Sequence, residues 1–203
     1  AGLAALYAYQ SYQAWQVNKE LLLGKKTYPP QERYQFGQVA LLEFTYITNF
    51  GSELAAITVL PPFFFFFFSL TPVMAATMAA SYSFLNLVSR PSGGLISDKF
   101  GSRRWTMVFI TVGIGFSYLF VQGINSSWPI FIAIAVTMIS AYFAQAGCGA
   151  TYGIAPLIKR ELTGQIAGNV GAYGNFGGVV YLTIFSLTDA STMFKAMGIS
   201  ALI

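Results

Sequence analysis

The stretch that decides the fold is PIFIAIAVTMISAYFAQAGCG, residues 129–149, an apolar run that contains no charged side chain. A helix needs about 20 mainly apolar residues to cross the hydrocarbon core of a bilayer, and this run is long enough to do so. Four further stretches meet the same condition, and another begins near Thr192. The expected spans are 38–60, 70–90, 105–123, 129–149, 166–187 and 192–203, the last too short for a full crossing. The sequence therefore predicts an all-α, polytopic transmembrane helical bundle.

The overall composition supports this class and excludes several others. Of 203 residues, 9% are charged and 55% are hydrophobic, whereas roughly a quarter of the residues in a soluble domain are charged. There is no histidine, and Cys148 is the single cysteine, which argues against disulfides, a metal site and histidine-dependent catalysis. No pair of acids suggests acid–base work, so we expect neither an enzyme nor a cofactor. The basic residues have no interleaved stacking aromatics, so nucleic acid is not an expected partner.

The chain divides into three parts by polarity. Residues 1–17 look like the end of an upstream transmembrane helix, residues 18–37 like a polar cytoplasmic linker, and residues 38–203 like the bundle itself. The chain starts without Met, and its last apolar stretch stops in mid-helix. We therefore interpret it as an internal fragment of a larger membrane protein, with membrane lipid around the bundle.

Basic residues fall almost entirely on one side of the membrane if the spans alternate. Positively charged loops stay cytoplasmic, so the loops at 18–37, 91–104 and 158–163 are expected inside. Lys195 alone begins a helix from the opposite side. The residues on the expected inner side are Lys19, Lys25, Lys26, Arg33, Lys99, Arg103, Arg104, Lys159 and Arg160.

Arg90 lies within the lower half of the expected span at 70–90. A charged side chain in a span usually faces a cavity or a partner, and a guanidinium presents parallel N–H donors that suit a flat oxyanion. The alternative is an arginine that snorkels to the cytoplasmic headgroups, because the expected span ends nearby.

A second candidate site lies in the span at 38–60. Tyr46, Phe50 and Glu53 are spaced i, i+4 and i+7, which places them on one helical face. An aromatic stripe commonly serves packing alone, but a carboxylate deep in a span needs a partner or a proton. Pro61-Pro62 is expected to end or kink this helix, and the rings of residues 63–68 to anchor its outer end.

A glycine-rich stretch occupies the span at 166–187. Gly164, Gly168, Gly171, Asn175 and Gly178 form a single stripe at helical spacing, which favours close approach of helix backbones. Packing alone would explain a lone pair of such glycines. We interpret the stripe as one that also lets a polar substrate approach, with the Asn175 amide presented to it.

A short loop between two spans carries the clearest motif. It reads GLISDKFGSRR at 94–104, with Gly94, Asp98, Gly101, Arg103 and Arg104 at fixed offsets. An ordinary positive-inside loop is the simpler alternative, but the pattern resembles the cytoplasmic loop motif of the major facilitator superfamily. The resemblance implies the C-terminal six-helix half of that fold, helices 7–11 with parts of 6 and 12, and implies that the loop is a cytoplasmic gate.

The glycine-rich run at 168–178 and the residues around Arg90 together resemble the nitrate/nitrite porter family of that superfamily. The resemblance implies transport of nitrate or nitrite by alternating access in a bacterial plasma membrane. It also implies a missing N-terminal half of the same transporter. Glu53 would favour proton-coupled uptake. Exchange of nitrate for nitrite, transport of another small solute, and a non-transporting scaffold remain alternatives. The implied substrate-binding residues are Arg90, Tyr46, Phe50, Asn175, Gly168 and Gly171.

Overall fold

The computed structural model describes residues 2–25, 27, 29 and 33–203, in two separate units that divide after Tyr34. The first unit contains one helix, α1 (Gly2–Leu22), none of whose residues is buried. This helix extends beyond residue 17 into the range expected as a linker, and Lys26 of that linker lies outside the described residues.

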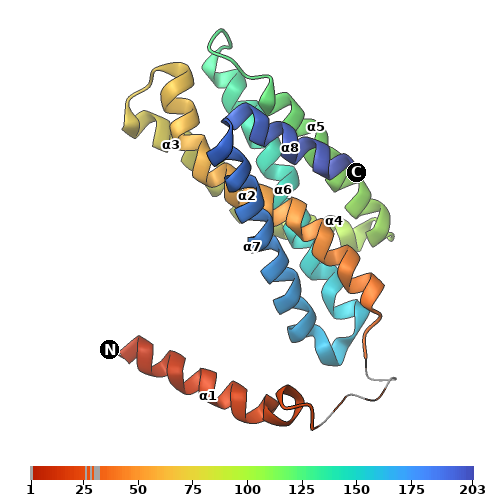
Figure 1. The fold of residues 1–203 in the computed structure, drawn as a ribbon. Helices are drawn as coiled ribbons and strands as arrows, with labels where there is room; N and C mark the ends of the chain where they lie inside the picture. The colour runs from red at the N-terminus through yellow and green to blue at the C-terminus, as the bar shows by residue number, and fades with distance from the viewer. Residues whose placement is uncertain (1, 26, 28, 30–32) are drawn as a thin grey trace. The chain divides into compact units, whose positions relative to one another are not determined.

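The second unit is a bundle of helices, and no strand occurs in the described part of the chain (Figure 1). Within it, α2 lies along α7, α4 lies along α6, and α5 packs between α6 and α8. The prediction of an all-α bundle is confirmed. The elements in order are α2 (Phe36–Phe68), α3 (Pro72–Phe84), α4 (Asn86–Lys99), α5 (Arg103–Gln122), α6 (Ile130–Ile158), the 3-10 turn η2 (Arg160–Leu162), α7 (Thr163–Leu187) and α8 (Ala190–Leu202).

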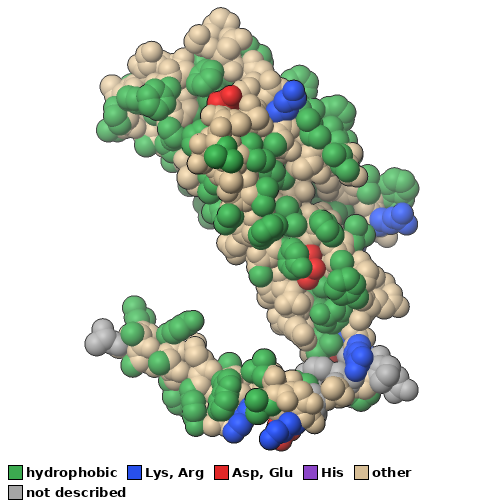
Figure 2. All heavy atoms as spheres, viewed as in Figure 1, with side chains coloured by type: hydrophobic (Ala, Val, Ile, Leu, Met, Phe, Trp, Pro, Cys, Tyr) green, Lys and Arg blue, Asp and Glu red, His purple; other side chains and the backbone are tan. Residues whose placement is uncertain are grey.

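Four helical segments are long and apolar enough to cross a membrane: α2, α5, α6 and the segment at 160–187. Large apolar side chains are exposed on the bundle, including Phe44 at 68% and Phe176 at 58%. Figure 2 shows mainly hydrophobic and uncharged side chains on the visible face of the bundle. A surface of this kind suits lipid rather than water.

The expected single span at 70–90 is not continuous, since the single residue Leu85, whose backbone dihedral angles stay in the right-handed helical region, separates α3 from α4. There the Leu85 N–H donates to the carbonyls of Ser81 and Ser83, and α4 begins at the next residue. The expected loop at 91–104 is also wrong in its first part, since α4 continues through Pro91 and Gly94 to Lys99. Proline and glycine suggested a turn there, but this stretch is helical and packs on α6.

The helix α2 continues through Pro61-Pro62 to Phe68, so of the two expected outcomes, an end or a kink, the end is excluded. Packing of the phenylalanine run accounts for this continuation. Phe63 stacks on Phe67 at 4.6 Å between ring centroids and meets the edge of Phe194 in α8 at 5.8 Å. Phe64 is fully buried, whereas Phe66 is 74% exposed. The run therefore anchors the helix end in protein on one side only.

Two glycines bring α4 and α6 into backbone contact. A Cβ added at Gly93 would collide with the carbonyl of Ala146, and one added at Gly149 would collide with the carbonyl of Arg90. Both obstacles are backbone atoms, which cannot rotate away as a side chain end could. This close contact fixes the position of the Arg90 backbone against α6.

We predict that Gly149→Ala destabilises the protein by about 1–3 kcal/mol, because the added methyl group must push α4 away from α6. The measurement is the thermal unfolding midpoint of the detergent-purified protein. Gly164→Ala is the matched control, since nothing lies within 4 Å of a Cβ added there. Equal midpoints for the two variants would contradict the prediction.

Candidate functional site

The aromatic face predicted on α2 is built around a stacked pair. The rings of Tyr46 and Phe50 are nearly parallel, at 2°, with centroids 5.3 Å apart, and Tyr152 of α6 meets Tyr46 edge-on at 5.3 Å. Tyr46 is 2% exposed, whereas Phe50 is partly exposed. The pair therefore forms a wall whose outer ring remains accessible.

Arg90 lies beside this wall, in the second turn of α4. Because α4 continues to Lys99, Arg90 lies about 14 Å along the axis from the helix end. Its guanidinium lies 5.7 Å from the Phe50 ring centroid, within cation–π range. Its Nη2 lies 2.9 Å from Glu53 Oε2, and its side chain is 37% exposed. The guanidinium is thus held by a carboxylate inside the bundle rather than directed to the helix end.

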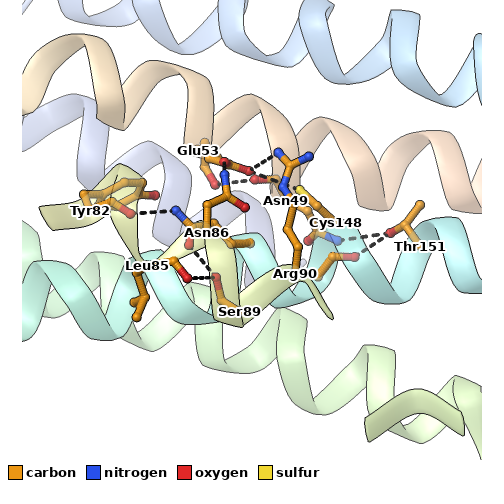
Figure 3. A network of polar contacts seen from close by, with 12 residues as sticks. Asn49, Glu53, Tyr82, Leu85, Asn86, Ser89, Arg90, Cys148 and Thr151 are labelled. Atoms are coloured by element: carbon orange, nitrogen blue, oxygen red, sulfur yellow. Dashed lines mark hydrogen bonds and ion pairs between the residues drawn. The ribbon is translucent and has the colours of Figure 1, made fainter. Parts of the chain in front are cut away.

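The Glu53 carboxylate, 2% exposed, accepts hydrogen bonds from three side chains on two other helices (Figure 3). Arg90 Nη2 in α4 donates at 2.9 Å, Asn86 Nδ2 at the start of α4 at 2.7 Å, and Cys148 Sγ in α6 at 3.4 Å. The need for a partner was predictable from the sequence, but Asn86 and Cys148 were missed. Asn86 lies one turn before Arg90 and so shares its face of α4. No signal in the sequence pointed to Cys148.

Polar side chains also brace the break at Leu85. Ser89 Oγ contacts the Leu85 carbonyl at 2.9 Å and Gln145 Oε1 of α6 at 2.5 Å. Gln145 Nε2 donates to the Tyr82 carbonyl at 2.8 Å. These bonds tie the end of α3 and the start of α4 to α6. They therefore fix the position of the first turn of α4, which carries Asn86 and leads to Arg90.

Two polar atoms of the site are buried without a partner among the described residues, namely Arg90 Nε and Asn86 Oδ1. One is a donor and the other an acceptor, and buried polar atoms are rarely left unpaired. The site therefore has unused hydrogen-bonding capacity. The arginine has five N–H donors in all, of which Glu53 occupies one.

The helix α7 packs on this site through Gly178 of the expected stripe and through Gly174 and Gly177, which lie outside it. Gly174 faces Tyr46 and Phe50, Gly177 faces the backbone of Ile47, and Gly178 faces Leu54. A Cβ at Gly164 or Gly168 would meet nothing within 4 Å, and one at Gly171 would touch only the Tyr152 hydroxyl at 3.4 Å. Asn175 is exposed and donates to the Gly171 carbonyl. Most of the expected stripe therefore faces away from α2.

The loop motif forms a clamp at one end of the bundle. Asp98 pairs with Arg103 at 2.7 Å, and Arg103 Nη1 also donates to the Gly153 carbonyl of α6 at 2.7 Å. Gly101 adopts a φ of +68°, which other residues rarely adopt. Gly94 lies within the last turns of α4, and Arg104 is exposed in the first turn of α5. The clamp joins α4, α5 and α6 at the end expected to be cytoplasmic.

These features define a polytopic integral membrane protein with an ionic site inside its helical bundle. Comparison with known proteins identifies the particular family. The chain is 76% identical over 201 residues to the nitrate/nitrite transporter NrtP of Nostoc punctiforme, covering 99% of this chain and 40% of the relative. It is 56% identical over 190 residues to the protein of that name from Picosynechococcus, covering 93% of this chain and 36% of the relative.

A more distant relative is the high-affinity nitrate transporter 2.3 of Oryza sativa, 35% identical over 167 residues, covering 78% of this chain and 32% of the relative. No family model matches the chain, and no solved structure matches it. The chain belongs to the nitrate/nitrite porter family of the major facilitator superfamily and matches the C-terminal part of its members, about two fifths of their length. The relatives are named as transporters, not as enzymes.

We predict that Glu53→Leu destabilises the protein by about 3 kcal/mol, because it leaves a largely enclosed guanidinium without its counter-charge. The partial exposure of Arg90 keeps the expected loss at the lower end of the range for buried pairs. Adding Arg90→Leu to the same chain is expected to restore most of the loss. The measurement is the thermal unfolding midpoint of each variant, and a double variant less stable than Glu53→Leu would contradict the prediction.

Proposed function

We propose that this chain is the C-terminal half of a transporter that carries nitrate and nitrite by alternating access across a bacterial plasma membrane. The observation that carries the proposal is Arg90, held inside the bundle beside Phe50 in a chain closely similar to proteins named nitrate/nitrite transporters. The remaining half of the transporter is the partner that would close the site. The segments at 18–37 and 158–163, and the short connection between α4 and α5 at 100–102, would be cytoplasmic, as the positive-inside rule predicts.

In this proposal Arg90 is the group that binds the anion. A guanidinium is flat and permanently charged, and two of its parallel N–H groups match two oxygens of a flat oxyanion. Its donors beyond the one used by Glu53 supply those bonds. Phe50, under the guanidinium, and Tyr46, stacked behind Phe50, form an apolar wall that keeps water from the anion.

The opposing side of the site is assigned to α7. Gly174 lies against Tyr46 and Phe50, so the neighbouring surface of α7 is next to the aromatic wall. Gly168 and Gly171 have no side chains that project from that surface, and Asn175 is exposed on it. Rocking of the two halves would then alternate access around the site. The clamp of Asp98, Arg103 and Gly153 would hold the inner gate.

Glu53 is assigned the coupling role. While it is ionised, its charge offsets that of Arg90 at 2.9 Å and weakens the attraction of the site for a second anion. A proton taken up by Glu53 removes this competition, so the anion binds to an arginine whose charge is no longer neutralised. Proton uptake and anion binding would therefore favour one another.

The substrate role of Arg90 is testable in a chimera in which this chain replaces the matched 201 residues of the Nostoc punctiforme transporter. We predict that Arg90→Lys raises the KM for nitrate about tenfold or more, because lysine keeps the charge and loses the paired donors. The measurement is labelled nitrate uptake, with nitrite and sulfate as competitors. Lys195→Arg, an exposed exchange in α8, is the matched control.

Unchanged uptake by the Arg90→Lys variant would overturn the anion-binding role. Absence of nitrate or nitrite uptake by the unmodified chimera would overturn the proposed function as a whole, since the parent transporter supplies the rest of the molecule.

The coupling role has its own prediction. Glu53→Gln is expected to abolish nitrate uptake driven by a pH gradient, because an amide cannot take up a proton, and to leave nitrate counterflow in proteoliposomes in place. Gradient-driven uptake that persists in this variant would contradict proton coupling through Glu53. Nitrate-for-nitrite exchange that needs no gradient in the unmodified chimera would establish the exchanger alternative.

A further inference from the structure

Asn86 has a feature that the proposed function does not use. Its amide nitrogen donates to Glu53 Oε1 at 2.7 Å, while its amide oxygen is buried and has no partner among the described residues. An asparagine amide has a donor at one end and an acceptor at the other. In Asn86 the amide nitrogen donates a hydrogen bond, and the amide oxygen accepts none from the described residues.

The position of the Asn86 amide is fixed by the start of α4 and by its contacts. Asn86 is the first residue of α4, directly after the break at Leu85, and the Ser89–Gln145 contact fixes the same turn to α6. Asn86 and Arg90, one helical turn apart, bind the two different oxygens of the Glu53 carboxylate. The carboxylate is thus held between them.

The hydrogen bonds that Glu53 can make change when it binds a proton. An ionised carboxylate only accepts hydrogen bonds, whereas the protonated acid also has an O–H that must be donated. Arg90 has no acceptor, and the Cys148 sulfur accepts weakly. The other titratable groups within electrostatic reach of Glu53 are the hydroxyls of Tyr82 in α3 and Tyr118 in α5, which bond to each other at 2.8 Å.

We propose that Asn86 is a positioning residue that serves both protonation states of Glu53 through rotation of its amide. With Glu53 ionised, Nδ2 donates to Oε1. When a proton from water binds to Oε1, a half-turn about the Cβ–Cγ bond brings Oδ1 to the place of Nδ2, and the new O–H donates to it. The carboxyl group then keeps its position beside Arg90 in both states. This inference rests on the proposed coupling role of Glu53.

The test uses the chimera in proteoliposomes, with the KM for nitrate counterflow measured across pH. Asn86→Leu removes the donor and the acceptor together. We expect the KM to rise about tenfold at both acid and alkaline pH, with an unchanged midpoint, because in each protonation state the carboxyl group loses the bond that holds it in position beside Arg90. A midpoint displaced by about one pH unit, with the acid limb intact, would mean that Asn86 serves only the ionised form.

Asn86→Asp separates the two ends of the amide, because it keeps an acceptor and replaces the donor. At acid pH we expect its KM to stay near that of the unmodified chimera. At alkaline pH we expect its KM to rise, because two carboxylates are then adjacent. A KM at acid pH as high as that of Asn86→Leu would overturn the acceptor role of Asn86. Asn125→Asp, in the exposed loop before α6, is the matched control, and thermal unfolding checks that each variant folds.

Failure of the coupling role is separately visible. If the pH dependence of the KM persists in Glu53→Gln, Glu53 is not the group that titrates, and the inference about Asn86 falls with it. If Glu53→Gln removes the pH dependence but Asn86→Leu changes neither limb, the coupling role stands and the inference alone is wrong.

Discussion

The structure depends on one constraint: a guanidinium and a carboxylate inside a bundle of apolar helices must stay together. Either charge alone would be costly there, and the pair is tolerable only when further donors satisfy the carboxylate. Glu53 meets this condition with Arg90, Asn86 and Cys148, which come from α4 and α6. The pair therefore fixes the mutual positions of α2, α4 and α6. It also leaves the arginine partly exposed, as the proposed anion-binding role requires.

The backbone is shaped to serve this pair. Glycines at 93 and 149 let α4 lie directly on α6, so that Arg90 is held by backbone contact as well as by its ion pair. The single residue Leu85 separates α3 from α4 just before Asn86, and the contact of Ser89 with Gln145 ties this turn to α6. Interruptions in membrane helices commonly occur where a transporter builds its site.

The helix α7 divides its small residues between two tasks. Gly174, Gly177 and Gly178 let it pack closely on α2, whereas a Cβ added at Gly164 or Gly168 would meet none of the described residues within 4 Å. The second group lies on the exposed side together with Asn175. Since the chain matches about two fifths of the length of its relatives, this surface is the natural place for the proposed site to meet the remainder of the transporter.

The sequence by itself determined the helical class, the main apolar segments, the shared face of Tyr46, Phe50 and Glu53, and the arginine that the site is built around. These follow from local properties, namely the length of an apolar run and the 3.6-residue period of a helix. Only the tertiary structure decided which groups complete the carboxylate site, which glycines of α7 pack on α2, and that α2 continues through two prolines. Each of these depends on contacts between residues far apart in the chain, and the rotation of one helix against another is not encoded in the period of either.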